Sequence, residues 1–256
     1  MEELPSFDSS AIRAVAFDGY GTLFDFTMTH FRVEVTSLLL SQGISVDHEA
    51  FFETWTKAYA QGDVWQRDPT DAGMNIDRMV TGPLPDWHSQ WEIWRRQFAA
   101  ALATHGVQGD AEAAADHFRA RLSETPPYSD ALDTVEALHA RGYSLALLSN
   151  ADEDFLQHAL VAARLRFSVI QSSESLRAYK PHGAVFGALG SRLGLEPGEI
   201  LYVGDSPFAD VTGAHRAGLR TAWLRRTETP YPERAVPPDL QLGTLAGLLE
   251  VLPPRP

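Results

Sequence analysis

From Pro126 onward, short apolar runs alternate with longer segments in which apolar residues recur at helical spacing. Glycines follow several of the helical segments, as is typical of helix ends. Strands separated by helices indicate a parallel sheet with crossover helices, so this alternation predicts an α/β fold. We expect helices over about 130–141, 153–163, 183–193, 209–217 and 245–252, and strands over 144–148, 168–170, 200–203 and 221–224.

A further apolar run, Val15–Phe17, lies near the start of the chain and is expected to be the first strand of the same sheet. Residues 28–125, which follow it, have the apolar spacing of helices. Within them, residues 62–87 are rich in Pro and Gly, and we expect this irregular segment, with one short helix around Met74–Val80, to lie near the entrance of a site as a lid or binding loop. The chain therefore divides into a sheet domain, residues 1–27 and 126–256, and a helical insertion, residues 28–125.

The composition limits the partners of this chain of 256 residues. Its formal net charge of −13 opposes binding to nucleic acid and to anionic membranes. No apolar run approaches the roughly 18 residues of a membrane span, and the first residues lack the features of a signal peptide. The absence of cysteine excludes thiolate catalysis. We expect a cytoplasmic monomer or homodimer that acts on a small molecule, without a nucleic-acid or membrane partner.

Polar residues stand where the predicted strands end. The carboxyl ends of parallel strands share one edge of a sheet, where ligands bind in open α/β folds, so these side chains are expected to converge. Each of them, taken alone, is also typical of an ordinary turn or a solvated loop. The residues at the strand ends are Asp18, Ser149 and Asn150, Lys180, and Asp205 with Asp210.

These residue types indicate a particular chemistry. A carboxylate such as Asp18 can act as a covalent nucleophile, while a hydroxyl and an ammonium hold the transferred group and balance its charge. Asp18 and Asp205 can share Mg²⁺, which prefers oxygen ligands. Without a cation, close carboxylates repel, and one of them tends to take up a proton.

Four segments resemble, in order, the four motifs of the haloacid dehalogenase (HAD) superfamily. They are Phe17–Asp25, Leu148–Asn150, Tyr179–Pro181 and Val203–Ser206 with Asp210. The resemblance covers about residues 12–252 and implies a Rossmann-like parallel-sheet core with an inserted α-helical cap. It also implies that Asp18 is the nucleophile and that Ser149 and Lys180 bind the transferred group.

The motifs do not all resemble the same subgroup of the superfamily. HAD phosphatases carry a second Asp, an acid and base, two residues after the nucleophile, and Tyr20 stands there instead. An Asp-x-Tyr sequence is similar to that of the 2-haloacid dehalogenases, in which the halide leaves without a proton. The fourth motif, with Asp205 and Asp210, instead resembles the magnesium-binding phosphatases and phosphonatases. The dehalogenases also have Tyr six residues after the motif Lys, where this chain has Phe186.

The motif pattern and the repulsion between carboxylates favour Mg²⁺ as a cofactor. The expected metal site consists of Asp18, Asp205, the backbone carbonyl of Tyr20, and Asp210 close by. The residues expected to bind substrate are Tyr20, Thr22, Asn150 and Arg67, of which Arg67 is the candidate for the cap arginine that grips a substrate carboxylate in dehalogenases.

The sequence therefore predicts a Mg²⁺-dependent hydrolase that forms an aspartyl covalent intermediate with a small phosphate or phosphonate. Two alternatives remain open. One is a metal-independent 2-haloacid dehalogenase, and the other is a degenerate protein that binds a phosphorylated ligand without turnover.

Overall fold

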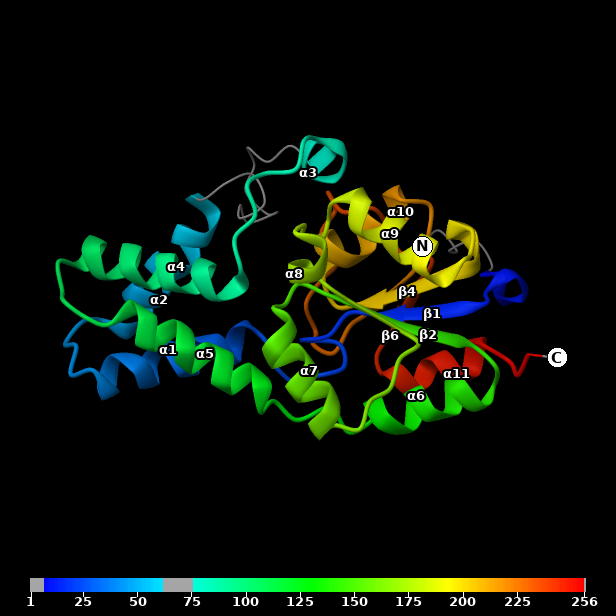
Figure 1. The fold of residues 1–256 in the computed structure, drawn as a ribbon, viewed down its shortest axis with the longest axis horizontal. Helices are drawn as coiled ribbons and strands as arrows, with labels where there is room; N and C mark the ends of the chain where they lie inside the picture. The colour runs from blue at the N-terminus through cyan, green and yellow to red at the C-terminus, as the bar shows by residue number, and fades with distance from the viewer. Residues whose placement is uncertain (1–6, 62–75, 256) are drawn as a thin grey trace.

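The computed structural model describes residues 7–61 and 76–255. A parallel six-stranded sheet forms its centre, in the order β3-β2-β1-β4-β5-β6 (Figure 1). The predicted α/β fold with a parallel sheet is confirmed. The strands are β1 (Ala14–Phe17), β2 (Ser144–Ser149), β3 (Val169–Ser172), β4 (Ile200–Gly204), β5 (Arg220–Leu224) and β6 (Leu240–Leu242).

Helices separate the strands as expected from the sequence, except that β5 and β6 are joined by a segment without a helix. Those between β1 and β2 are α1 (Met28–Ser41), α2 (His48–Gln61), α3 (Ile76–Thr81), α4 (Gln90–His105), α5 (Ala111–Ser123) and α6 (Ala131–Ala140). The later ones are α7 (Glu153–Ala162), α8 (Ser173–Leu176), α9 (Gly183–Leu193), α10 (Gly213–Arg216) and α11 (Leu248–Val251).

Three local predictions were inaccurate. The segment expected as one helix over 209–217 begins as a π-helical turn over Pro207–Thr212 and continues as the short α10. The helix expected over 245–252 is a 3₁₀ turn followed by α11. Strand β6 was missed, because its three residues lie beyond a Pro-rich segment that hides the strand pattern.

Alternate residues of each strand face opposite layers of helices, as the pleat of a strand requires. Val15 and Phe17 of β1 belong to the large hydrophobic core that includes α6, α7 and α11. Ala14 and Ala16 belong to a smaller core with α9 and α10. The sheet is thus covered on both faces, which explains why its central strands are continuous apolar runs (Figure 1).

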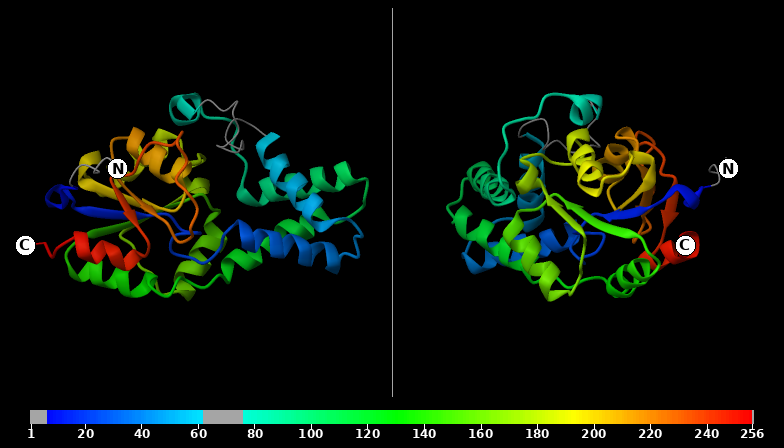
Figure 2. Two further views of the ribbon diagram at one scale, coloured as in Figure 1. Left: turned by 180° about the vertical axis from the view of Figure 1, so that it is seen from behind. Right: turned by 45° about the vertical axis from the view of Figure 1, so that its right-hand side comes forward.

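Helices α1 to α5 form the inserted cap. In the left view of Figure 2, α1, α2, α4 and α5 lie beyond the carboxyl ends of the strands, whereas α3 lies beside α10, with which Asp77 and Arg216 form an ion pair. The chain leaves the core and returns to it side by side. The amide of Asp25 donates to the carbonyl of Pro126 at 3.0 Å, and the amide of Tyr128 donates to Leu23 at 2.8 Å. The helical cap predicted from the sequence is confirmed, and it is held close to the strand ends.

Aromatic rings join the cap to the sheet domain in one continuous core. Trp94 of α4 packs against Phe118 of α5 and against Phe155 of α7, with ring centroids 5.7 and 5.6 Å apart. Phe155 also contacts Tyr20 in the loop after β1, at 5.8 Å. The cap therefore shares buried rings with the core instead of resting on it through polar side chains alone.

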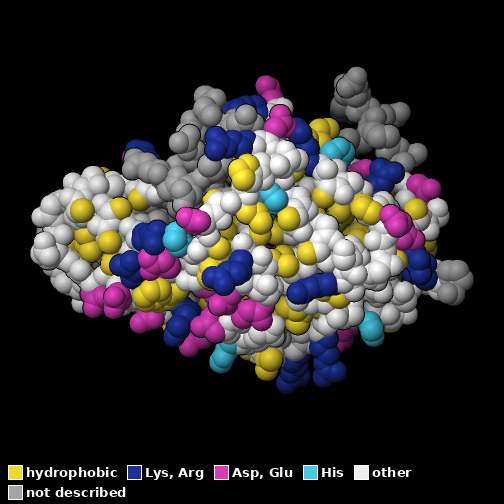
Figure 3. Space-filling view, turned by 45° about the horizontal axis from the view of Figure 1, so that its top comes forward, with side chains coloured by type: hydrophobic (Ala, Val, Ile, Leu, Met, Phe, Trp, Pro, Cys, Tyr) yellow, Lys and Arg dark blue, Asp and Glu magenta, His cyan; other side chains and the backbone are white. Residues whose placement is uncertain are grey.

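Acidic and basic side chains are interspersed over the face shown in Figure 3, so the net negative charge does not gather there into one block. Within the described part of the chain, no helix is long and apolar enough to cross a membrane.

Candidate active site

Glycines allow the loop after β1 to approach the neighbouring strand ends. A Cβ atom on Gly19 would lie 2.8 Å from Oγ of Ser149 at the end of β2. Gly21 has φ +92°, and a Cβ there would lie 2.5 Å from Oδ2 of Asp205. The loop therefore brings three strand ends together only because these two positions lack side chains.

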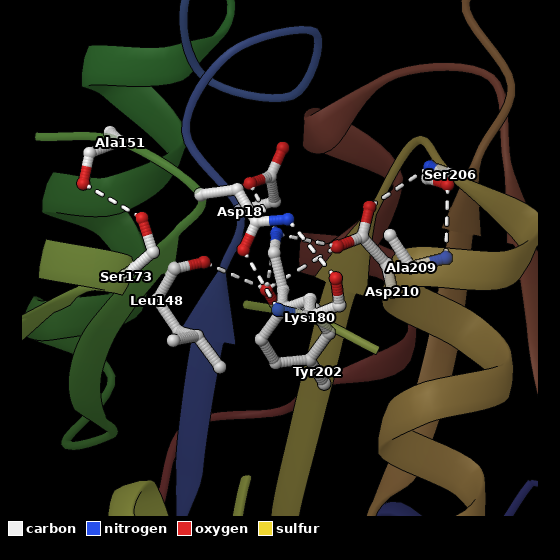
Figure 4. A network of polar contacts seen from close by, with 10 residues as sticks. Asp18, Leu148, Ala151, Ser173, Lys180, Tyr202, Ser206, Ala209 and Asp210 are labelled. Atoms are coloured by element: carbon white, nitrogen blue, oxygen red, sulfur yellow. Dashed lines mark hydrogen bonds and ion pairs between the residues drawn. The ribbon is translucent and has the colours of Figure 1, made fainter. Parts of the chain in front are cut away.

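Lys180 lies at the centre of the site (Figure 4). Its Nζ donates to Oδ1 of Asp18 at 2.5 Å, to Oδ1 of Asp210 at 2.7 Å and to the hydroxyl of Tyr202 at 3.1 Å. All four side chains are buried or nearly so. The convergence predicted for the strand ends is therefore present around this ammonium group.

Burial and neighbouring charges shift the acid–base equilibria of these groups. Burial raises the pKa of Asp18 to about 6, although the ammonium of Lys180 opposes the shift. Burial alone would lower the pKa of Lys180, but Asp18 and Asp210 raise it well above its ordinary value. Lys180 is thus a permanent cation, whereas Asp18 is mostly ionised at neutral pH.

Three carboxylates form a cluster that fits a divalent cation. Oxygen atoms of Asp18, Asp205 and Asp210 all lie within 4.8 Å of one another. Burial, followed by the charges of Asp18 and Asp210, raises the pKa of Asp205 well above its ordinary value. A Cβ on Gly204 would lie 2.3 Å from the Asp210 carboxylate, so the backbone closely surrounds the cluster. Oxygen-only donors in such a cradle suit Mg²⁺, and the magnesium site stays a prediction.

The Asn150 side chain holds the backbone that carries Lys180. Its Oδ1 accepts the Lys180 amide at 2.8 Å, and its Nδ2 donates to the Lys180 carbonyl at 3.2 Å. Asn150 was expected to contact substrate. In the structure, its amide group ties the loop after β2 to the loop that precedes α9.

The other three residues predicted to bind substrate are Tyr20, Thr22 and Arg67, and the structure describes the first two. The hydroxyl of Tyr20 donates to the carbonyl of Leu122 at the end of α5, at 3.1 Å, and burial raises its pKa above the ordinary value. The Thr22 hydroxyl is fully buried and has no hydrogen-bond partner among the described residues. Arg67 lies outside the described residues.

Two further residues that the sequence did not predict lie at the site. Tyr202, in the middle of β4, accepts from Lys180 and donates to the carbonyl of Leu148 at 2.8 Å. The feature of the sequence that could have indicated Tyr202 is a ring with a hydroxyl group within an otherwise apolar strand. Arg226 follows β5 and donates to the carbonyl of Thr22 at 2.9 Å and to Asp130. Nothing near it in the sequence indicated that role.

A model of the haloacid dehalogenase-like hydrolase family matches residues 12–218. The chain belongs to this family of hydrolases. It is 26% identical over 244 residues to (S)-2-haloacid dehalogenase 4A of Burkholderia cepacia, covering 94% of this chain and 95% of that protein. It is 31% identical over 203 residues to a phosphoserine phosphatase of Thermus thermophilus, covering 77% of each chain.

The comparison of structures agrees with this assignment. A solved dehalogenase structure with an intermediate complex has a TM-score of 0.72 and 26% identity, covering 98% of this chain and all of that one. The HAD-like hydrolase identified from the four motifs is therefore confirmed, together with its capped fold. Membership in a hydrolase family favours an enzyme over the non-catalytic binder.

Proposed function

We propose that this hydrolase displaces halide from a short 2-haloacid, with Asp18 as the nucleophile. The observation that carries the proposal is a buried carboxylate at the exit of β1, paired with Lys180 at 2.5 Å beneath the cap. Several relatives that match more than nine-tenths of the chain are 2-haloacid dehalogenases. This reaction thus replaces phosphate hydrolysis, the first expectation from the sequence, as the leading candidate.

The reaction divides into two steps at Asp18. Its carboxylate attacks the carbon that bears the halogen, so a carbon–oxygen bond forms as the carbon–halogen bond breaks and halide departs with the electron pair. Water then attacks the carbonyl carbon of the aspartyl ester, and the bond between that carbon and the ester oxygen breaks. One proton of the water goes to the hydroxyl of the departing 2-hydroxyacid, the other is released to solvent, and the carboxylate of Asp18 is restored. Lys180 balances negative charge at Asp18, and Ser149 lies beside the same loop.

Tyr20 supports a leaving group that needs no proton. Its hydroxyl donates to Leu122, and its pKa is raised by burial, so it is a poor acid at neutral pH. A general acid typically contributes about 10²–10⁴-fold to a reaction whose leaving group must be protonated. Halide requires none of this help.

A second candidate is Mg²⁺-dependent hydrolysis of an activated phosphate, such as an acyl or aryl phosphate. The cluster of Asp18, Asp205 and Asp210 favours it, because three carboxylates accompany one ammonium. These residues would hold the metal ion, which would balance the charge of the phosphoryl group. Asp18 would attack phosphorus instead of carbon, and the leaving group would again depart without a strong acid.

One experiment separates the two reactions. The purified enzyme is treated with EDTA, and halide release from (S)-2-chloropropionate and phosphate release from acetyl phosphate are measured with and without added Mg²⁺. Metal-independent halide release that is lost in Asp18→Asn is expected. Phosphate release that requires Mg²⁺, without halide release, would establish the second candidate, and turnover of neither substrate would reject both.

A further inference from the structure

The first turn of α4, in the cap, is capped by a carboxylate from the sheet domain. Asp152, at the start of α7, accepts the amide of Gln90 at 2.7 Å and the amide of Trp91 at 3.0 Å. The first amides of a helix have no partner within the helix, and they carry partial positive charge. Asp152 is buried, so this contact fixes the start of α4 to α7 without competition from water.

The cap segment that leads into α4 makes a second set of contacts with the sheet domain, beside Lys180. The hydroxyl of Tyr179 donates to the carbonyl of His88 at 2.7 Å. The ring of Tyr179 packs with Ile93 of α4. His182, on the other side of Lys180, lies 2.9 Å from the carbonyl of Gly82 through its Nε2.

Asn150 connects the contact made by Asp152 with the contacts made by Tyr179 and His182. Its side chain forms hydrogen bonds with both the backbone amide and the backbone carbonyl of Lys180, and it lies two residues before Asp152 in the sequence. The segment over residues 82–91 thus closes a ring of contacts with the loop after β2 and the loop that carries Lys180. A displacement of the start of α4 would therefore displace both loops.

We propose that Asp152 and Tyr179 are positioning residues that use the cap segment 82–91 to hold Lys180 Nζ between Asp18 and Asp210. They do not contact the reacting atoms. The inference builds on the role of Lys180 in the proposed function, but its first consequence, the order of the Lys180 loop, does not depend on any substrate.

The test compares Asp152→Asn, Tyr179→Phe and the double variant with two matched controls. Asp154→Asn removes a carboxylate from the same end of α7, where its partner is the exposed Arg119. Tyr143→Phe removes a hydroxyl that donates to a backbone carbonyl far from the cap, that of Pro253 at 2.9 Å. Both controls are expected to behave as the wild type.

Hydrogen–deuterium exchange, without substrate, is followed in peptides over residues 86–95 and 178–184. The loss of a hydrogen bond to a charged group is expected to raise the rate of amide exchange about tenfold to a hundredfold. In Asp152→Asn we expect this faster exchange in both peptides. Steady-state kinetics on the active substrate should show a fall in kcat of at least about tenfold, with a smaller change in KM.

The outcomes divide clearly. Faster exchange that is confined to residues 86–95, with unchanged exchange at 178–184 and unchanged kcat, would overturn the proposal and leave a purely structural cap. Faster exchange in both peptides of an enzyme that turns over neither test substrate would support the positioning role while rejecting the proposed function. A loss of exchange protection in the controls as well would overturn the proposal, because the effect would then be general destabilisation.

Discussion

Replacing Asp205 by Asn should stabilise the metal-free protein. The carboxylate oxygens of Asp205, Asp18 and Asp210 lie within 4.8 Å of one another. Two unit charges at that distance repel by about 3.5 kcal/mol at an effective dielectric constant of about 20. Asn keeps the shape of the side chain and removes one charge. Proton uptake by Asp205 lowers the realised gain, and we expect about 1–3 kcal/mol at about pH 8.

The gain should depend on pH in a defined direction. The pKa of Asp205 is raised by burial and by its two acidic neighbours, so the folded protein keeps a proton that the unfolded chain releases. Wild-type stability therefore falls as pH rises from about 4, the ordinary value for Asp, toward the raised value. Asp205→Asn lacks this dependence, so its advantage should be small at about pH 5 and larger at about pH 8.

Thermal unfolding in EDTA measures the effect, which corresponds to a rise in Tm of about 2–4 °C per kcal/mol for a protein of this size. Adding Mg²⁺ should then stabilise the wild type, by about 2.7 kcal/mol at a hundredfold excess over Kd, and leave the variant nearly unchanged. A lower Tm of metal-free Asp205→Asn at the higher pH would refute the repulsion argument. Equal responses to Mg²⁺ would remove Asp205 from the metal site.

Three further predictions concern the loop after β1. Because the pKa of Asp18 is raised to about 6 and the nucleophile must be ionised, kcat/KM should fall about tenfold for each pH unit below about 6 in a buffer series. Arg226→Lys should lower the free energy of unfolding in urea by about 1.5–3 kcal/mol, because the bond to the Thr22 carbonyl and a two-pronged ion pair are lost. Gly21→Ala should remove activity and lower Tm, because its Cβ would press on Asp205.

Matched controls make these outcomes decisive. An acid limb of kcat/KM near the ordinary pKa of Asp, about 4, would contradict the raised value. Arg220→Lys, in an exposed ion pair, should change stability by less than about 1 kcal/mol, and an equal loss at both sites would contradict the loop role of Arg226. Gly142→Ala has a similar φ, +84°, and an added Cβ there would meet its nearest neighbour at an ordinary 3.5 Å, so it separates backbone strain from contact with Asp205.

The sequence predicted the sheet and the converging residues because both follow from local patterns. Buried strands such as Val15–Phe17 are short apolar runs, and a parallel sheet then places Asp18, Ser149 and Asp205 at one edge. No similar pattern marks β6, whose place is set by pairing with β5.

Contacts between distant parts of the chain could not be predicted in this way. Asp152 meets Gln90 across 62 positions, and Arg226 meets Thr22 across 204. An isolated Asp or Arg in the sequence carries no sign of such a partner. Tyr20 shows the same limit, since only the folded cap reveals that its hydroxyl is directed to Leu122.

The aromatic core shared by cap and sheet domain has a consequence for unfolding. Detaching the cap would expose the facing rings of Trp94 and Phe155 to water at once, at a cost of about 1.5–3 kcal/mol for a fully buried large side chain. Neither part can melt early without weakening the other. The protein should therefore lose its cap and its sheet in a single calorimetric transition, even though the chain builds them from separate segments.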